Sequence, residues 1–329
     1  MFVCKMSPVK VAFVGKGGSG KTTLAALFAQ ELAADGARVL ALDADINQNL
    51  AEALGAAADQ AVLWSPLGEH LAELKDYLRG DNPRIGSATS MVKTTPPGRG
   101  SRLLRPFDPN PVFETCVRRV GGVHVAVTGG FTEADLGVSC YHGKVGAVEL
   151  ILNHLVDTED EYVLVDMTAE ADAFASGLFT RFDRTIVVCE PTLRGVGVYR
   201  QYAGYAREFD VAFSVVGNKV DGPADEAFLR VQVGDALIGS VGVSAHVRAA
   251  ERGSRRTIGE LEPANRTTLH ALRCAVDATP RDWVRYTRQA VQFHLRNADA
   301  WGNTRTGENL ADQIDPEFVL GPAALVAVT

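Results

Sequence analysis

One run of eight residues has the types and the spacing that phosphate binding requires. Gly15-Lys16-Gly17-Gly18-Ser19-Gly20-Lys21-Thr22 fits the pattern G-x-x-x-x-G-K-[ST] in full, and Thr23 follows it. Glycines let backbone N–H groups converge on phosphate oxygens, and a helix that begins beside them adds the positive end of its dipole. In such a run Lys21 reaches the β- and γ-phosphates, and the Thr22 hydroxyl binds Mg²⁺. The alternative is a glycine-rich turn that matches by accident, and the elements on either side disfavour it.

The elements that flank this run predict a doubly wound α/β fold with a mostly parallel sheet. A short apolar strand precedes the run, and residues 21–34 place apolar side chains at helical spacing before Gly36. Strand and helix patterns then alternate, which is the order that builds parallel strand–helix–strand units. We therefore expect one P-loop domain over residues 1–258. Its seven predicted strands are Lys10–Val14, Arg38–Leu42, Val123–Val127, Tyr162–Val165, Thr185–Cys189, Ala212–Val216 and Ala236–Ser240.

Two segments depart from this alternation. Residues 82–111 hold six of the 14 prolines, so we expect an insertion that is mostly loop and serves as a lid, a partner surface or a locally disordered stretch. Residues 259–329 are predicted to form a mainly helical C-terminal extension. Within it, Leu269, Leu272 and Val276 share one helix face.

Polar residues follow three of the predicted strands. Asp43 and Asp45 come after the second strand, Asp166 ends an apolar strand, and Asn218 and Lys219 end a later one. Taken singly, each acidic residue has an ordinary alternative as a helix cap or a turn residue. Because an α/β sheet places its ligand at the carboxyl ends of its strands, their shared placement favours one common site instead.

The phosphate run also resembles that of a known family. Residues 16–23, with a lysine at the second position of the loop, resemble the deviant Walker A run of the MinD/ParA/nitrogenase-iron-protein group, a SIMIBI-class family of P-loop ATPases. The resemblance implies a nucleotide-dependent homodimer in which Lys16 reaches the partner subunit's phosphates and acts on the developing charge. A solvated surface lysine is the alternative. Lys16 and Lys21 are thus the expected catalytic cations.

The same resemblance implies roles for the residues at the strand ends. Asp45 would orient or activate the attacking water, and Asp43 and Asp166 would support the water shell of Mg²⁺. Asn218 would hold the nucleotide base, with Lys219 beside it. ATP and Mg²⁺ are therefore the expected ligands.

GTP stays open as a second nucleotide. Asn218-Lys219-Val220-Asp221 spells the NKxD motif of GTP-binding proteins, in which the aspartate pairs with guanine. Four letters are a weak signal, and related metallocentre GTPases share this class of fold. Lys16 and the Asp43-Ala44-Asp45 run favour the ATP-using branch.

One branch of the family is especially similar. Residues 43–50 look like the D-A-D-x-N-x-N-L run of the CooC-type ATPases, accessory proteins for nickel insertion into carbon monoxide dehydrogenase. The resemblance covers roughly residues 10–255 and implies a metalloenzyme as client.

Two positions depart from the pattern of these relatives. Cys140 matches the first cysteine of that branch's C-x-C pair, and His142 stands where the second would be. Two such pairs across a dimer axis would suit Zn²⁺ or Ni²⁺, whereas a buried cysteine beside a capping histidine is the ordinary alternative. Glu170 replaces the glycine that the family usually has four residues after the Walker B aspartate, and its side chain is expected to slow hydrolysis.

Composition narrows the classes of function. The net charge of -7 argues against a general nucleic-acid binder. No stretch is long and apolar enough for a membrane span, no signal peptide is evident, and five scattered cysteines suit reduced thiols, so we expect a cytoplasmic protein. DNA or membrane contact, as in partition and positioning relatives, stays a less favoured alternative. It would use Arg281, Arg285, Arg288 and Arg296, which are expected on one helix face.

Overall fold

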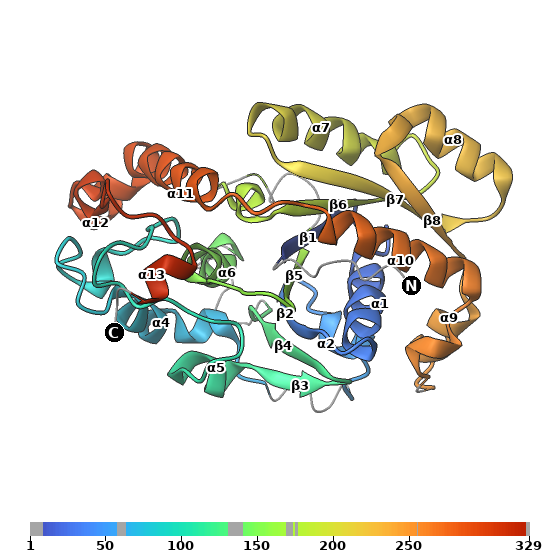
Figure 1. The fold of residues 1–329 in the computed structure, drawn as a ribbon, viewed down its shortest axis with the longest axis horizontal. Helices are drawn as coiled ribbons and strands as arrows, with labels where there is room; N and C mark the ends of the chain where they lie inside the picture. Colours follow the sequence, from blue (N-terminus) through green and yellow to red (C-terminus); the bar gives the residue numbers. More distant parts are fainter. Residues whose placement is uncertain are drawn as a thin grey trace.

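A mostly parallel eight-stranded sheet forms the centre of the computed structural model (Figure 1). The structure describes residues 9–57, 64–130, 141–168, 174, 177–254 and 256–326, with the side chains of 141–143 left out. The strand order is β3-β4-β2-β5-β1-β6-β7-β8, and the pairing is parallel except between β3 and β4. The strands are β1 Val9–Gly15, β2 Arg38–Ala44, β3 Arg118–Val120, β4 Val123–Val127, β5 Glu161–Met167, β6 Arg184–Cys189, β7 Ala212–Val220 and β8 Leu237–Gly242.

Helices cover both faces of this sheet. Alternate residues of β1 point to opposite faces: Val11 and Phe13 pack in the cluster with α1 and α10, and Ala12 and Val14 pack in the cluster with α6 and α7. Burial on both faces explains why the strands are continuous apolar runs. The described helices are α1 Lys21–Ala34, α2 Leu50–Ala53, α4 Leu71–Arg79, α5 Pro111–Cys116, α6 Tyr141–His154, α7 Gly195–Glu208, α8 Pro223–Val233, α9 Ala245–Glu251, α10 Pro263–Asp277, α11 Trp283–Asn297, α12 Asn303–Thr306 and α13 Pro322–Val326.

The predicted fold class is confirmed, with one strand more than the seven expected. The additional strand, β3, has three residues and pairs antiparallel with β4 at the edge of the sheet. It begins with the exposed residues Arg118 and Arg119, and the turn to β4 uses Gly121 and Gly122 at φ +54° and +91°. A strand this short and polar carries no alternation of apolar residues, so the sequence pattern does not reveal it.

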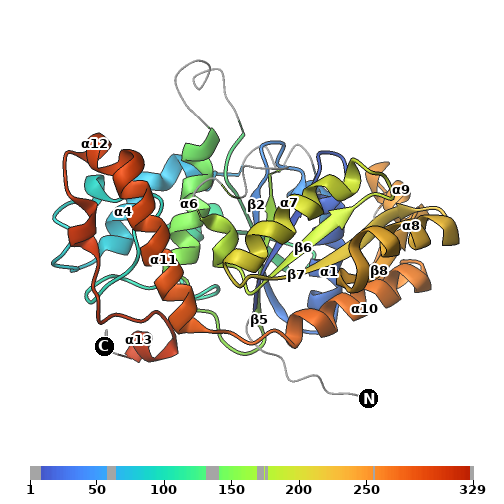
Figure 2. The same cartoon turned by 90° about the horizontal axis from the view of Figure 1, so that it is seen from above.

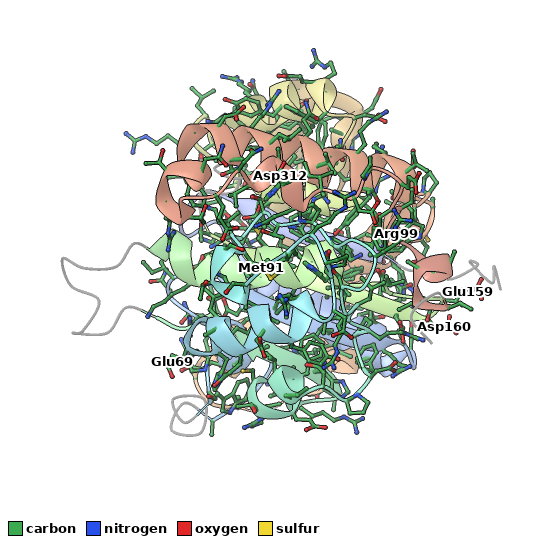
Figure 3. The ribbon with its side chains drawn as sticks, turned by 90° about the vertical axis from the view of Figure 1, so that its left-hand side faces the viewer. Glu69, Met91, Arg99, Glu159, Asp160 and Asp312 are labelled. Carbon is green, nitrogen blue, oxygen red and sulfur yellow. The ribbon has the colours of Figure 1, made fainter. Side chains whose placement is uncertain are left out.

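Residues 82–111 are mostly loop, with the short 3₁₀ turn Ala88–Ser90, an isolated β-bridge from Leu104 to Leu155 and the first residue of α5. This proline-rich insertion is packed rather than open, because Pro96, Pro97 and Gly98 are buried. Figure 3 shows this side of the molecule, with labels on Met91 and Arg99 of the insertion and on Asp312 of the C-terminal segment, residues 259–326.

Hydrogen bonds join the insertion to the C-terminal segment. The Arg99 guanidinium makes two contacts with the Asp315 carboxylate, at 2.8 and 3.2 Å. The Gln313 amide donates to the backbone oxygen of Ser90 at 3.1 Å, and the Thr94 hydroxyl lies 3.2 Å from Nδ1 of His294. Two segments about 200 positions apart in the sequence therefore form one packed unit.

The C-terminal helices divide between the two faces of the sheet. Leu269, Leu272 and Val276 of α10 are buried in the cluster that contains α1, which confirms the predicted apolar helix face. In Figures 1 and 2, α10 lies near α1, whereas α11 lies on the other side of the molecule next to α6. None of the described helices is long and apolar enough to cross a membrane.

The four expected arginines do not share one helix face, because only Arg285, Arg288 and Arg296 lie on α11. Arg281 precedes α11 and is buried in ion pairs with Asp157 and Asp183, so it is not part of a solvent-facing helix surface. Arg285 binds Asp210, at 2.9 Å between Nη1 and Oδ2. The Arg296 guanidinium lies 5.4 Å from the centre of the Phe209 ring. The helical spacing does not extend to Arg281, because Asp157 before β5 and Asp183 before β6 are buried and bind it in place of solvent.

Candidate nucleotide site

The phosphate loop connects the end of β1 to the start of α1. Gly18 and Gly20 adopt left-handed backbone conformations, with φ of +79° and +87°. A side chain at position 20 would also collide with its surroundings, because its Cβ would lie 2.1 Å from Nδ2 of Asn218. The glycine at position 20 is thus required by backbone conformation and by close packing.

The two polar side chains that begin α1 meet two of the predicted acids. Nζ of Lys21 lies 2.5 Å from Oδ2 of Asp45, and the two side chains are 8% and 5% exposed. The Thr22 hydroxyl donates to Oδ2 of Asp166 at 2.5 Å. Four residues from three separate segments therefore surround the loop at the carboxyl edge of the sheet, where the sequence predicts them.

Asp43 supports the loop after β2 from within the protein. Its carboxylate accepts hydrogen bonds from the backbone N–H of Asp45 at 3.1 Å and of Leu50 at 2.9 Å. Burial raises the pKa of Asp43 to about 7. In this arrangement Asp43 holds the backbone of the segment that carries Asp45.

Asp166 has the environment of a cation ligand. It pairs with Asp43 in the β2–β5 register, and burial, followed by the neighbouring Asp43 charge, raises its pKa well above the usual value. Its Oδ1 is buried and has no hydrogen-bond partner in the described part of the chain. Buried carboxylates next to the Thr22 hydroxyl form an all-oxygen donor set, which Mg²⁺ prefers. These residues therefore fit Mg²⁺.

The end of β7 holds the phosphate loop from the opposite side. Nδ2 of Asn218 donates to the backbone oxygen of Ser19 at 2.7 Å. Nζ of Lys219 donates to the backbone oxygen of Gly18 at 2.6 Å and lies 2.7 Å from Oε1 of Glu190. Two successive side chains thus hold two successive carbonyl groups.

A pocket of about 230 Å³ opens beside these contacts. The sequence predicts four of its lining residues, Gly20, Thr23, Asn218 and Lys219, but not the rest of the α1 wall, the end of β8 or α9, since no motif marks them. Its largely aliphatic lining and its position beside the loop suit a flat base. The lining residues are Gly20, Thr23, Leu24, Leu27, Asn218, Lys219, Val241, Gly242, Val243, Ser244, Val247, Arg248 and Glu251.

Lys16 is the first residue of the phosphate loop after β1. Lys16 is partly exposed between the buried Gly15 and the exposed Gly17, and its backbone oxygen accepts from the Ser19 N–H at 3.0 Å. A role of Lys16 across a dimer interface stays a prediction.

The predicted transition-metal pair lies outside the described residues. Cys140 is not described, nor is the side chain of His142, and the same holds for Glu170. Within the residues that are described, no group of three or more His, Cys, Asp or Glu side chains is arranged to hold a metal ion. A Zn²⁺ or Ni²⁺ site therefore stays a prediction.

Comparison with known proteins identifies a nucleotide-binding domain that contains this loop. Residues 11–256 match the family model described as "CobQ/CobB/MinD/ParA nucleotide binding domain". The carbon monoxide dehydrogenase accessory protein CooC of Rhodospirillum rubrum is 29% identical over 272 residues, which is 82% of this chain and 96% of that protein. An uncharacterized ATP-binding protein of Methanocaldococcus jannaschii is 24% identical over 64% of this chain and 75% of its own length.

Solved structures share the fold. A ParA family ATPase from Chlorobium tepidum has a TM-score of 0.56 at 16% identity and covers 81% of this chain and 98% of its own. The cell division ATPase MinD of Pyrococcus furiosus has a TM-score of 0.51 at 16% identity and covers 82% and 97%. The family model spans most of the chain and includes every residue from Lys16 to Lys219 that surrounds the loop. This chain therefore belongs to the CobQ/CobB/MinD/ParA nucleotide-binding family and is a P-loop ATPase.

Proposed function

We propose that this ATPase is Mg²⁺-dependent, works as a nucleotide-controlled homodimeric switch, and serves as an accessory factor for a metalloenzyme. The observation that carries the proposal is the convergence of Lys21, Thr22, Asp45 and Asp166 around the phosphate loop. These are the cation, hydroxyl and carboxylates that phosphoryl transfer to water needs.

Each side chain contributes by position and charge. Thr22 would bind Mg²⁺ and Asp166 would support its water shell, and the bound ion would supply charge neutralisation at the phosphates. Lys21 neutralises phosphate oxygens once it separates from Asp45, its partner at 2.5 Å. Asp45, released from Lys21, is then free to orient the attacking water. Nucleotide binding is thus coupled to a rearrangement of the segment that follows β2.

The geometry of Asn218 favours ATP over GTP. One N–H of its Nδ2 donates to the Ser19 carbonyl, and its Oδ1 can accept a hydrogen bond from a base in the pocket that Asn218 lines. An acceptor pairs with the exocyclic amino group of adenine and repels the exocyclic oxygen of guanine. Asp221, which would read guanine in an NKxD motif, is not among the residues that line the pocket, and its N–H bonds the Asp225 carboxylate.

The accessory role rests on the similarity to the carbon monoxide dehydrogenase accessory protein, which extends over 82% of this chain. It is compatible with a metal bound between two subunits by Cys140 and His142. The test is the metal content of the purified dimer, measured in parallel for the wild type and for Cys140→Ala. Equal low content in both proteins would remove the metal site. A cytoplasmic location stays a prediction from the cysteine pattern.

A DNA- or membrane-contacting role is less well supported. The structures of a ParA family ATPase and of MinD share the fold with this chain, at 16% identity in each case. Arg281, the first residue of the expected arginine face, is buried in ion pairs. Salt-dependent binding of DNA or anionic vesicles that is lost in Arg285→Ala/Arg288→Ala would restore this alternative.

One experiment tests the nucleotide mechanism. The molecular mass of the protein is measured by light scattering without nucleotide and with ADP, ATP or GTP, each with Mg²⁺, beside the rate of phosphate release. We expect a dimer and hydrolysis with ATP, and a loss of both in Lys16→Ala. A Lys16→Ala protein that dimerises and hydrolyses ATP like the wild type would overturn the dimer mechanism. Equal activity with GTP would overturn the assignment of adenine.

A further inference from the structure

Three chain segments meet at one backbone carbonyl of the phosphate loop. Nζ of Lys219, at the end of β7, lies 2.6 Å from the backbone oxygen of Gly18. The same ammonium lies 2.7 Å from Oε1 of Glu190, the residue that directly follows β6. The side chains of Lys219 and Glu190 are 53% and 23% exposed. The contact is therefore at the rim of the site, and Glu190 is the more enclosed partner.

The backbone of Glu190 is fixed by the start of α7. Its carbonyl oxygen accepts from the Thr192 N–H at 2.7 Å. A Cβ at position 195 would lie 2.4 Å from that oxygen, so a glycine is required where α7 begins. On the other side, the β6–β7 ladder ends with Cys189 paired to Gly217. Backbone contacts on both sides thus fix the position from which the Glu190 carboxylate extends.

The backbone of Lys219 is shaped to aim its side chain at the loop. Lys219 has φ +58°, a left-handed conformation that is uncommon for a residue with a side chain. The register between β7 and β8 shifts between Asn218 and Val220, which marks a bulge at this residue. Bulges redirect a side chain at the end of a strand, often beside a functional site.

The orientation of the Gly18 carbonyl matters because phosphate oxygens bind N–H groups and are repelled by carbonyl oxygens. In a trans peptide the C=O and the following N–H point in opposite directions. Carbonyls that Lys219 and Asn218 hold on the outer side of the loop therefore cannot turn their oxygens toward phosphate oxygens. Gly18 needs such an anchor, since it is exposed and a Cβ there would find nothing within 4 Å.

We propose that Glu190 is a positioning residue of the nucleotide site: it holds the Lys219 ammonium on the Gly18 carbonyl and thereby fixes the phosphate loop in its binding conformation. The proposal deepens the function proposed above and rests on it, because it requires nucleotide to bind at this loop. Glu190 itself does not contact phosphate. Its charge keeps the ammonium at the carbonyl and away from the phosphates.

The test compares Glu190→Gln with a matched control. Glu226→Gln removes the carboxylate of another exposed pair, Glu226–Arg230 at 3.4 Å on α8, far from the loop in sequence. For Glu190→Gln we expect the Kd for Mg·ADP and the KM for ATP to rise about three- to tenfold, with kcat within about twofold of the wild type. The control should match the wild type in all three quantities.

A double-mutant cycle separates positioning from a general structural effect. If Glu190 acts through Lys219, Lys219→Met alone and Lys219→Met/Glu190→Gln raise the Kd for Mg·ADP equally. The unfolding temperature without nucleotide should be the same in Glu190→Gln and Glu226→Gln. Additive effects, or an unchanged Kd and KM in Glu190→Gln, overturn the proposal while leaving the proposed function intact. A wild type that binds neither Mg·ADP nor Mg·ATP overturns the proposed function and this proposal with it.

Discussion

At the scale of single residues, Asp45 is held by two kinds of contact. Its Oδ2 pairs with Lys21 at 2.5 Å, and its Oδ1 accepts from the N–H and the side-chain amide of Asn47 at 2.9 and 3.0 Å. The Asp45 carboxylate therefore pairs with the same Lys21 ammonium that phosphate needs. Because Asp45 also binds Asn47, a movement of Asp45 would move the loop after β2 with it. A neutral side chain of the same shape would keep the loop contacts and release Lys21.

Asp45→Asn tests this arrangement. We expect kcat for ATP hydrolysis to fall about 100-fold or more, because an amide cannot accept a proton or orient water as a carboxylate does. The Kd for Mg·ADP should not rise, since the variant lacks the Asp45 carboxylate that competes with phosphate for the Lys21 ammonium. Single-turnover phosphate release and titration calorimetry measure the two effects. Hydrolysis within twofold of the wild type would show that Asp45 is not the water-orienting residue.

At the scale of elements, a buried histidine joins α11 to the proline-rich insertion. Nε2 of His294 lies 3.0 Å from the Leu310 carbonyl, which can only accept, so Nε2 carries the proton and Nδ1 accepts from Thr94 at 3.2 Å. Burial lowers the pKa of His294 to about 4. The junction therefore depends on a neutral imidazole.

This junction predicts a pH dependence of stability. In the unfolded chain His294 takes up a proton as the pH falls through about 6.5, and in the folded chain it does so near pH 4. The unfolded state binds more protons in this window, so stability is lost as the pH falls from about 6.5 to 4. Each histidine of this kind contributes up to about 1.4 kcal/mol per pH unit.

His294→Gln isolates this contribution, because the amide can make both hydrogen bonds but does not titrate. Urea unfolding at several pH values should give a shallower slope for the variant than for the wild type between pH 6.5 and 4. His154, whose pKa burial also lowers to about 4, titrates in both proteins and cancels in the comparison. Parallel slopes would contradict the prediction.

At the scale of the whole molecule, a buried charge cluster ties the C-terminal segment to the sheet. Lys10 at the start of β1 lies 2.9 Å from Asp157, and Arg281 pairs with both Asp157 and Asp183. All these side chains are at most 5% exposed. Burial lowers the pKa of Lys10 to about 8. Removing one member would leave the remaining charges buried and unbalanced.

We expect Arg281→Ala to lower the free energy of unfolding by about 3–5 kcal/mol, the usual effect of breaking a buried ion pair. Arg288→Ala is the matched control, because Arg288 is exposed on α11, and its effect should stay within about 0.5 kcal/mol. Urea denaturation measures both. Similar values for the two variants would mean that Arg281 is not a buried anchor.

Much of the nucleotide site was predictable because its determinants are local. The phosphate loop needs glycines, a lysine and a hydroxyl in one short run, and strand ends mark the carboxylates that join it. Lys21, Thr22, Asp45 and Asp166 meet as expected for that reason. The pocket walls from β8 and α9, and the contact of Glu190 with Lys219, depend on which strands become neighbours.

The sequence by itself determined the phosphate loop, the α/β fold class and most of the strands, since these follow from short-range patterns of glycine, charge and apolar periodicity. Tertiary structure alone decided three features: the short edge strand β3, the packing of residues 82–111 against the C-terminal segment, and the burial of Arg281. Each depends on partners that are far away in the sequence, such as Arg99 and Asp315. Helical spacing predicts that Arg281 lies on a solvated face, but the buried carboxylates of Asp157 and Asp183 bind it. Leaving those carboxylates unpaired would cost more free energy than Arg281 loses when it gives up its hydration.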